Sequence, residues 1–136
     1  MKMIQKAALF GAAAAMALAG SVATAAPASA ATYGGQCGTG YGVVNDFDLP
    51  NNRGTVFLTY NSSNGNNCVV TIRTTPGTAT FMEAFLKRSS SSTWVRDDGN
   101  YTTYAGPVYV AARGECVDWG GTIGTATDDR ERTNCG

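Results

Sequence analysis

The chain of 136 residues contains no histidine, and charged residues make up only 15% of it. Without histidine, the sequence lacks the side chain that most often serves as general base for a serine or cysteine nucleophile. No G-x-S-x-G motif occurs either. The four cysteines are widely separated, with no C-x-x-C pair of the kind that binds zinc. We therefore expect no catalytic residue, no metal site and no cofactor.

Apart from its first thirty residues, the sequence has no hydrophobic run that approaches the length of a membrane span. Within residues 1–30, two lysines precede an apolar stretch that ends in PASA, the small residues that signal peptidase requires. The stretch is short for an uncleaved membrane anchor. The pattern predicts a signal peptide over residues 1–30 and one secreted domain over residues 31–136, with no membrane attachment after cleavage.

Basic residues are also too few for a nucleic-acid or anionic-membrane surface. Removal of residues 1–30 leaves eight basic and ten acidic residues, a net charge of −2. Both of those partners require a basic surface, so neither is expected. The remaining 106 residues are enough for one domain but not for two. The pattern does not indicate an oligomeric state.

All four cysteines, Cys37, Cys68, Cys116 and Cys135, lie in the predicted secreted domain. An even number of cysteines in a small exported domain predicts disulfide bonds. Three pairings are possible. We favour Cys37–Cys68 and Cys116–Cys135, because each bond would tie one end of the chain into the fold. If stabilisation comes from the reduced entropy of the unfolded chain, each bond would add roughly 3–4 kcal/mol to the free energy of unfolding.

The clearest element is a β-hairpin over residues 53–73. In RGTVFLTY and in NCVVTIR, alternate residues form two sets that would lie on opposite faces of a strand. The loop NSSNGNN between the two runs contains an Asn-Gly pair suited to positive φ. The inward face is predicted to consist of Val56, Leu58, Cys68, Val70 and Ile72.

Residues 78–88 fit both a strand and a helix, because apolar residues recur there at two-residue and at four-residue spacing. Strand-like segments on either side and the Pro-Gly turn at 76–77 favour a strand. VYVAA and ECVDW predict two further strands, and DDGN at 97–100 predicts a turn before them. The polar tail from Thr125 is expected to be held by Cys135.

Short strands with turn signals every eight to twelve residues or so are typical of all-β domains. Thr, Val, Tyr and Gly are plentiful in the predicted domain, whereas Leu, Lys and Glu are scarce. We expect an all-β fold with minimal helix: a small disulfide-stapled β-sandwich, or a partly open barrel of short antiparallel strands.

Residues 94–119 are rich in aromatic side chains interleaved with Asp and Gly. Flat rings on an exposed face can stack against sugars, but packing in the core explains aromatic residues in a domain this small, and we favour it. The alternation in ECVDW leaves open whether its cysteine or its tryptophan faces inward. Trp94 and Tyr104 are the residues most expected at the surface. The candidate ligand face consists of Trp94, Tyr104, Tyr109 and Trp119.

The segments NRGTVFLTYNSSNGNNCVVTIRTTPGT, YAGPVYV, CVDWGG and the terminal TNCG occur in this order. Together they resemble the spore-associated protein family of filamentous actinomycetes, small secreted proteins found with the spore surface. The resemblance runs from about Tyr33 to Gly136 and includes all four cysteines. It implies an extracellular β domain without an assigned reaction, so no catalytic residue carries over.

These features together predict a non-enzymatic secreted protein associated with the spore or cell surface, with a spore or cell-wall component as its partner. Two alternatives remain. One is a small secreted hydrolase inhibitor that presents a rigid loop, such as NSSNGNN or SSSST, to its target. The other is a carbohydrate-binding module that uses an aromatic face.

Overall fold

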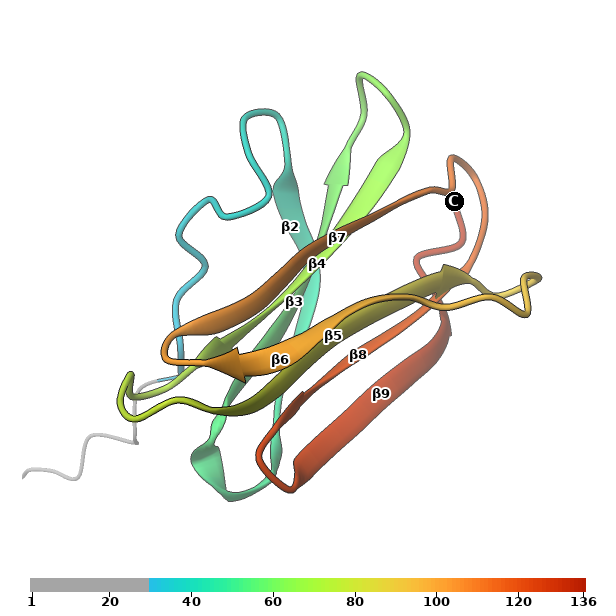
Figure 1. Cartoon of the computed structure of the whole chain (residues 1–136). Coiled ribbons are helices and arrows are strands. Elements are labelled where there is room, and N and C mark those ends of the chain that lie inside the picture. Colours follow the sequence, from blue (N-terminus) through green and yellow to red (C-terminus); the bar gives the residue numbers. More distant parts are fainter. Residues whose placement is uncertain (1–29) are drawn as a thin grey trace, which may run out of the picture.

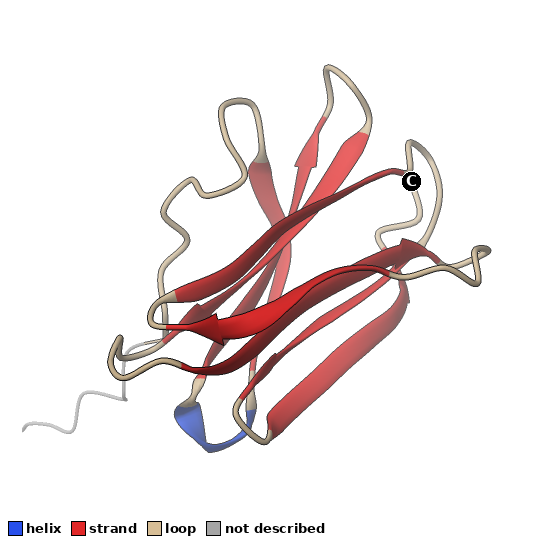
Figure 2. Ribbon diagram, in the orientation of Figure 1, coloured by secondary structure: helices blue, strands red, loops and turns tan. Residues whose placement is uncertain are grey.

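The computed structural model describes residues 30–136, which form eight strands and one short turn of 3-10 helix. The predicted signal peptide therefore lies outside the described residues, except for its last residue. Figure 2 shows the helical turn η3 (Pro50–Asn52) as the one blue segment of this part of the chain. The strands are β2 (Gly42–Asp48), β3 (Gly54–Asn61), β4 (Asn66–Arg73), β5 (Thr80–Arg88), β6 (Val95–Tyr101), β7 (Tyr104–Ala111), β8 (Val117–Ile123) and β9 (Ala126–Thr133).

The strands form two four-stranded antiparallel sheets, in the orders β2-β3-β4-β7 and β6-β5-β8-β9. Figure 1 shows the second sheet packed in front of the first. Neither sheet closes into a barrel, so the all-β prediction is confirmed in its sandwich form. The chain changes sheet three times, between β4 and β5, between β6 and β7 across Thr102 and Thr103, and between β7 and β8.

The main core lies between the two sheets, and the segment that fitted both a helix and a strand contributes to it as β5. Met82, Ala84 and Leu86 are fully buried, with intervening residues on the outer side. Alternate residues of a strand point to opposite faces, so a two-residue spacing delivers all three side chains to one core. The favoured interpretation of residues 78–88 as a strand is confirmed.

The hairpin of β3 and β4 is confirmed, but the inward face predicted for β4 is wrong. The register pairs Leu58 with Val69 and Phe57 with Val70. Leu58 and Val69 therefore share the inner face, and Phe57 and Val70 share the outer one. Both faces of β4 are apolar, so its composition could not show which side faces the core, and a one-residue shift exchanges the two faces. The residues placed on the wrong face are Cys68, Val70 and Ile72.

The outer face of the first sheet carries a second apolar cluster. Phe57, Val70 and Ile72 are buried there, and Ala31 and Tyr33 pack against them. The ring centroids of Tyr33 and Phe57 lie 5.8 Å apart. The segment before β2 therefore covers the part of this face that β3 and β4 form.

The segment predicted as a turn and the polar tail, for which no strand was predicted, are both strands. Residues 97–100 lie inside β6, and the tail from Thr125 forms β9 almost entirely. Pairing with β5 and β8 supplies hydrogen bonds that outweigh a local preference for turns. Asp97 also ties β6 to β7, because its carboxylate accepts hydrogen bonds from the Tyr101 hydroxyl at 2.6 Å and the Gly106 N–H at 2.8 Å.

The disulfide bonds are Cys37–Cys68 and Cys116–Cys135, the pairing that the sequence favours. The first joins the segment before β2 to β4. The second joins the tail after β9 to the residue before β8. Each bond therefore holds one end of the described chain against a sheet.

Candidate functional site

Trp119 is not part of a ligand face, because its side chain is 0% exposed. It points inward with Val117, which answers the question that the alternation in ECVDW left open. Its ring centroid lies 5.0 Å from that of Phe47, and its Nε1–H donates to Thr133 Oγ1 at 2.8 Å. Trp119 is therefore wrongly included in the candidate ligand face, and it packs in the core, the interpretation that the sequence favoured.

Tyr104 and Tyr109 lie on the outer face of the first sheet and are 38% and 42% exposed. The Tyr109 hydroxyl donates to the backbone oxygen of Cys37 at 2.8 Å, and the ring of Tyr41 packs edge-on against it at 5.5 Å. Burial raises the pKa of the Tyr109 phenol, and the nearby Tyr41 and Tyr33 raise it further. Tyr109 therefore stays protonated and helps to hold the segment before β2 on the sheet.

Trp94 lies on the other sheet. Its ring packs edge-on against Phe85 at a centroid distance of 5.2 Å. Lys87 Nζ lies 5.2 Å from the Trp94 ring centroid, and the Arg96 guanidinium lies 5.9 Å from it. Phe81 follows on the same side of β5 and is 43% exposed. We call this surface the Trp94 face; its residues are Phe81, Phe85, Lys87, Trp94 and Arg96.

The four predicted aromatic residues are thus divided between two outer faces and the core. Sequence reasoning missed Phe81 and Phe85, although a signal for them was present. Once β5 is a strand with Met82, Ala84 and Leu86 inside, its alternation places both phenylalanines outside.

A glycine beneath Phe85 lets its ring lie close to the sheet. Gly120 of β8 stands opposite Phe85 in the ladder. A Cβ atom at Gly120 would come within 2.7 Å of the Phe85 ring, so any larger residue there would displace the ring. The ring can therefore lie against the backbone of β8 instead of standing away from the sheet.

Carboxylates neutralise both cations of the Trp94 face. Lys87 Nζ lies 3.1 Å from an oxygen of Asp118, and Arg96 pairs with Glu83. The face therefore presents aromatic rings between paired charges, with hydrogen-bond donors and acceptors at its edge. Such cation–aromatic contacts contribute about 0.5–1 kcal/mol at exposed sites.

Asp118→Asn is expected to reduce the loss of stability that the protein undergoes in acid. Burial acts to raise the pKa of Asp118, but hydrogen bonds from Ser89, the Arg132 N–H and Lys87 outweigh it and hold the pKa below its usual value. Because the pKa is lower in the folded state, the ionised group stabilises the fold above the unfolded-state pKa. That contribution is lost as the pH falls through the folded-state pKa.

Urea unfolding of wild type and Asp118→Asn at a series of pH values below about 5 measures this effect. The free energy of unfolding should fall less steeply in the variant. Asp129→Asn, which changes an exposed carboxylate of β9, should retain the wild-type slope. Equal slopes for wild type and Asp118→Asn would contradict the assignment.

Within residues 30–136, no three His, Cys, Asp or Glu side chains lie close enough together to hold a metal ion. The same part of the chain has no helix with the length and apolar character needed to cross a membrane.

Comparison with known proteins finds one close similarity. Over 124 aligned residues, which span 87% of this chain and 80% of the other protein, the sequence is 50% identical to spore-associated protein A of Streptomyces coelicolor. No family model matches the chain. No solved structure matches it either.

Proposed function

This chain belongs to the spore-associated protein A family, and from that membership we propose that it is a secreted, non-enzymatic protein of the spore or cell surface. The identity to the Streptomyces coelicolor protein carries the proposal, because that protein's name states an association with spores. The signal-peptide pattern and two disulfide bonds support an extracellular location, since disulfides persist in oxidising environments.

The inventory of side chains supports a role in binding instead of catalysis. The chain has no histidine to act as a base near neutral pH. Hydrogen bonds from Arg130 and the Asp129 N–H lower the pKa of Asp128, and the pKa of Asp118 is lowered as well. Both carboxylates are therefore ionised at neutral pH, and neither can donate a proton to a leaving group.

We propose the Trp94 face as the surface that attaches the protein to a spore or cell-wall component. The chain's own segment before β2 covers β3 and β4 on the outer face of the first sheet and leaves Tyr104 and Tyr109 exposed on β7. On the second sheet, Phe81 is 43% exposed, and the partly exposed Trp94 packs against Phe85, so aromatic and cationic side chains gather on one uncovered face. Trp and Arg are among the residues enriched at the hot spots of binding surfaces, and this face carries both Trp94 and Arg96.

A sedimentation assay with washed spores tests this function. Purified wild-type protein should co-sediment with the spores, and Trp94→Ala should lower its apparent affinity at least about tenfold, as expected for an aromatic hot spot. Tyr104→Ala is the matched control, because it removes an exposed aromatic residue from the other sheet. It should bind as wild type does.

The possible results separate the two parts of the proposal. Wild-type protein that stays in the supernatant would contradict association with the spore. Equal binding of wild type and Trp94→Ala would contradict attachment through the Trp94 face while leaving the association itself intact.

A further inference from the structure

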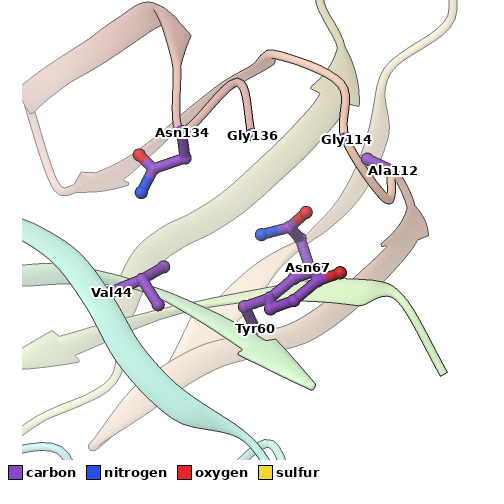
Figure 3. A pocket seen from close by; sticks show the side chains of 7 residues that line it. All are labelled: Val44, Tyr60, Asn67, Ala112, Gly114, Asn134 and Gly136. Carbon is purple, nitrogen blue, oxygen red and sulfur yellow. The ribbon is translucent and has the colours of Figure 1, made fainter. Parts of the chain in front are cut away.

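A pocket of about 160 Å³ opens at the end of the sandwich where the β3–β4 loop lies (Figure 3). It shares no residue with the Trp94 face. Its volume corresponds to about five water molecules at roughly 30 Å³ each and is well below the roughly 300–1,000 Å³ of pockets for drug-sized ligands. The lining residues are Val44, Tyr60, Asn67, Ala112, Gly114, Asn134 and Gly136.

The walls of the pocket come from segments far apart in the sequence. A bulge between Val43 and Asn45 shifts the register of β2, and Val44 at the bulge lines the pocket. On the opposite side, the tail after β9 is held by the bond between Cys135 and Cys116. The Asn45 side-chain N–H also donates to Asn134 Oδ1 at 3.1 Å, which joins the tail to β2.

A buried amide faces this pocket with part of its hydrogen-bonding capacity unused. Asn67 is 2% exposed and donates from Nδ2 to the Thr59 backbone oxygen at 3.2 Å. Within residues 30–136, no group donates to its Oδ1, and this oxygen is not among the buried atoms that lack a hydrogen-bond partner, so the pocket leaves it open to water. It can accept a hydrogen bond from a ligand that carries an N–H or O–H group.

Asn134 supplies the complementary group. Its Oδ1 is occupied by Asn45, so its Nδ2 remains as a donor at the pocket rim. Figure 3 shows the amides of Asn67 and Asn134 on two sides of the opening. The pocket thus offers one acceptor and one donor, together with the aromatic ring of Tyr60 and the apolar side chains of Val44 and Ala112.

We propose that this pocket binds the acetamido group of one N-acetylated sugar residue, with the sugar ring at the pocket's opening. An acetamido group carries one N–H and one C=O, which match Asn67 Oδ1 and Asn134 Nδ2. Its methyl group suits Val44 and Ala112, and the sugar ring suits the flat side chain of Tyr60. Among the described residues, no charged side chain lines the pocket. An anionic ligand would therefore lose its hydration without gaining a counter-charge.

Titration of isotope-labelled protein with N-acetylglucosamine, followed by ¹H–¹⁵N NMR, tests the proposal. The side-chain amide signals of Asn67 and Asn134 and the backbone amide of Gly114 should shift in a saturable manner. Glucose, which has the ring without the acetamido group, should leave them in place. No shift with N-acetylglucosamine, or equal shifts with both sugars, would overturn the assignment.

Asn134→Gly is the decisive variant, because the backbone there has φ 54°, which glycine adopts without strain. It should keep the fold and weaken binding of N-acetylglucosamine about tenfold. Asn52→Gly is the matched control: it is the same substitution at φ 59° in the turn before β3. It should bind as wild type does, and wild-type affinity in Asn134→Gly would contradict the proposal. Because Trp94 is untouched, this result is independent of spore attachment.

Discussion

Trp119→Ala is expected to lower the free energy of unfolding by about 3–5 kcal/mol, the range for removal of a large buried aromatic side chain. Trp119 is fully buried between the sheets and packs against Phe47. Its indole N–H bonds Thr133, the last residue of β9. Loss of the ring would leave a cavity in the core and free the end of that strand.

Trp94→Ala is the matched control, since it removes the same side chain from an outer face. It should lower the free energy of unfolding by no more than about 1 kcal/mol. Denaturant unfolding of the two oxidised variants, followed by near-ultraviolet circular dichroism, measures the difference. Similar losses in both would show that the two tryptophans are not divided between core and surface.

Replacement of Cys37 and Cys68 by alanine is expected to cost roughly 3–4 kcal/mol, because the 31-residue separation then no longer constrains the unfolded chain. The double variant should also release the segment before β2. That segment is held on the first sheet by this bond, by the packing of Tyr33 on Phe57 and by the hydrogen bond from Tyr109 to Cys37. The outer apolar cluster would then become accessible.

The double variant Cys116→Ala with Cys135→Ala is the control. Its 19-residue separation predicts a loss of about 3 kcal/mol, but the outer cluster of the first sheet should stay covered. Binding of a hydrophobic dye under native conditions separates the two, with a rise only for the Cys37 and Cys68 variant. A rise in both, or in neither, would contradict the covering role of the first bond.

The difference between the two outer faces connects the fold to the proposed function. A sheet that is apolar on both sides needs a cover, and the chain covers its first sheet with its own segment before β2. The second sheet keeps accessible aromatic residues between paired charges. A protein attached through that face would leave the pocket lined by Asn67 and Asn134 available for a second contact.

Local pattern was enough for several features of this protein. The alternation in RGTVFLTY and NCVVTIR predicted the hairpin, and the turn signals predicted an all-β fold, because both depend on neighbouring residues alone. Of the three possible disulfide pairings, the sequence favoured the one observed, because each of its bonds ties one end of the domain into the fold. The absence of histidine from the composition needed no structure at all.

By contrast, which side of each strand faces the core depended on pairing with strands that are distant in the sequence. β4 is apolar on both sides, so only the register with β3 placed Val70 outside. β6 and β9 are polar, and only pairing with β5 and β8 made them strands. Four aromatic residues within 26 positions were dispersed because successive strands enter different sheets and because alternate residues point in opposite directions. The Trp94 face and the pocket exist only where these strands meet.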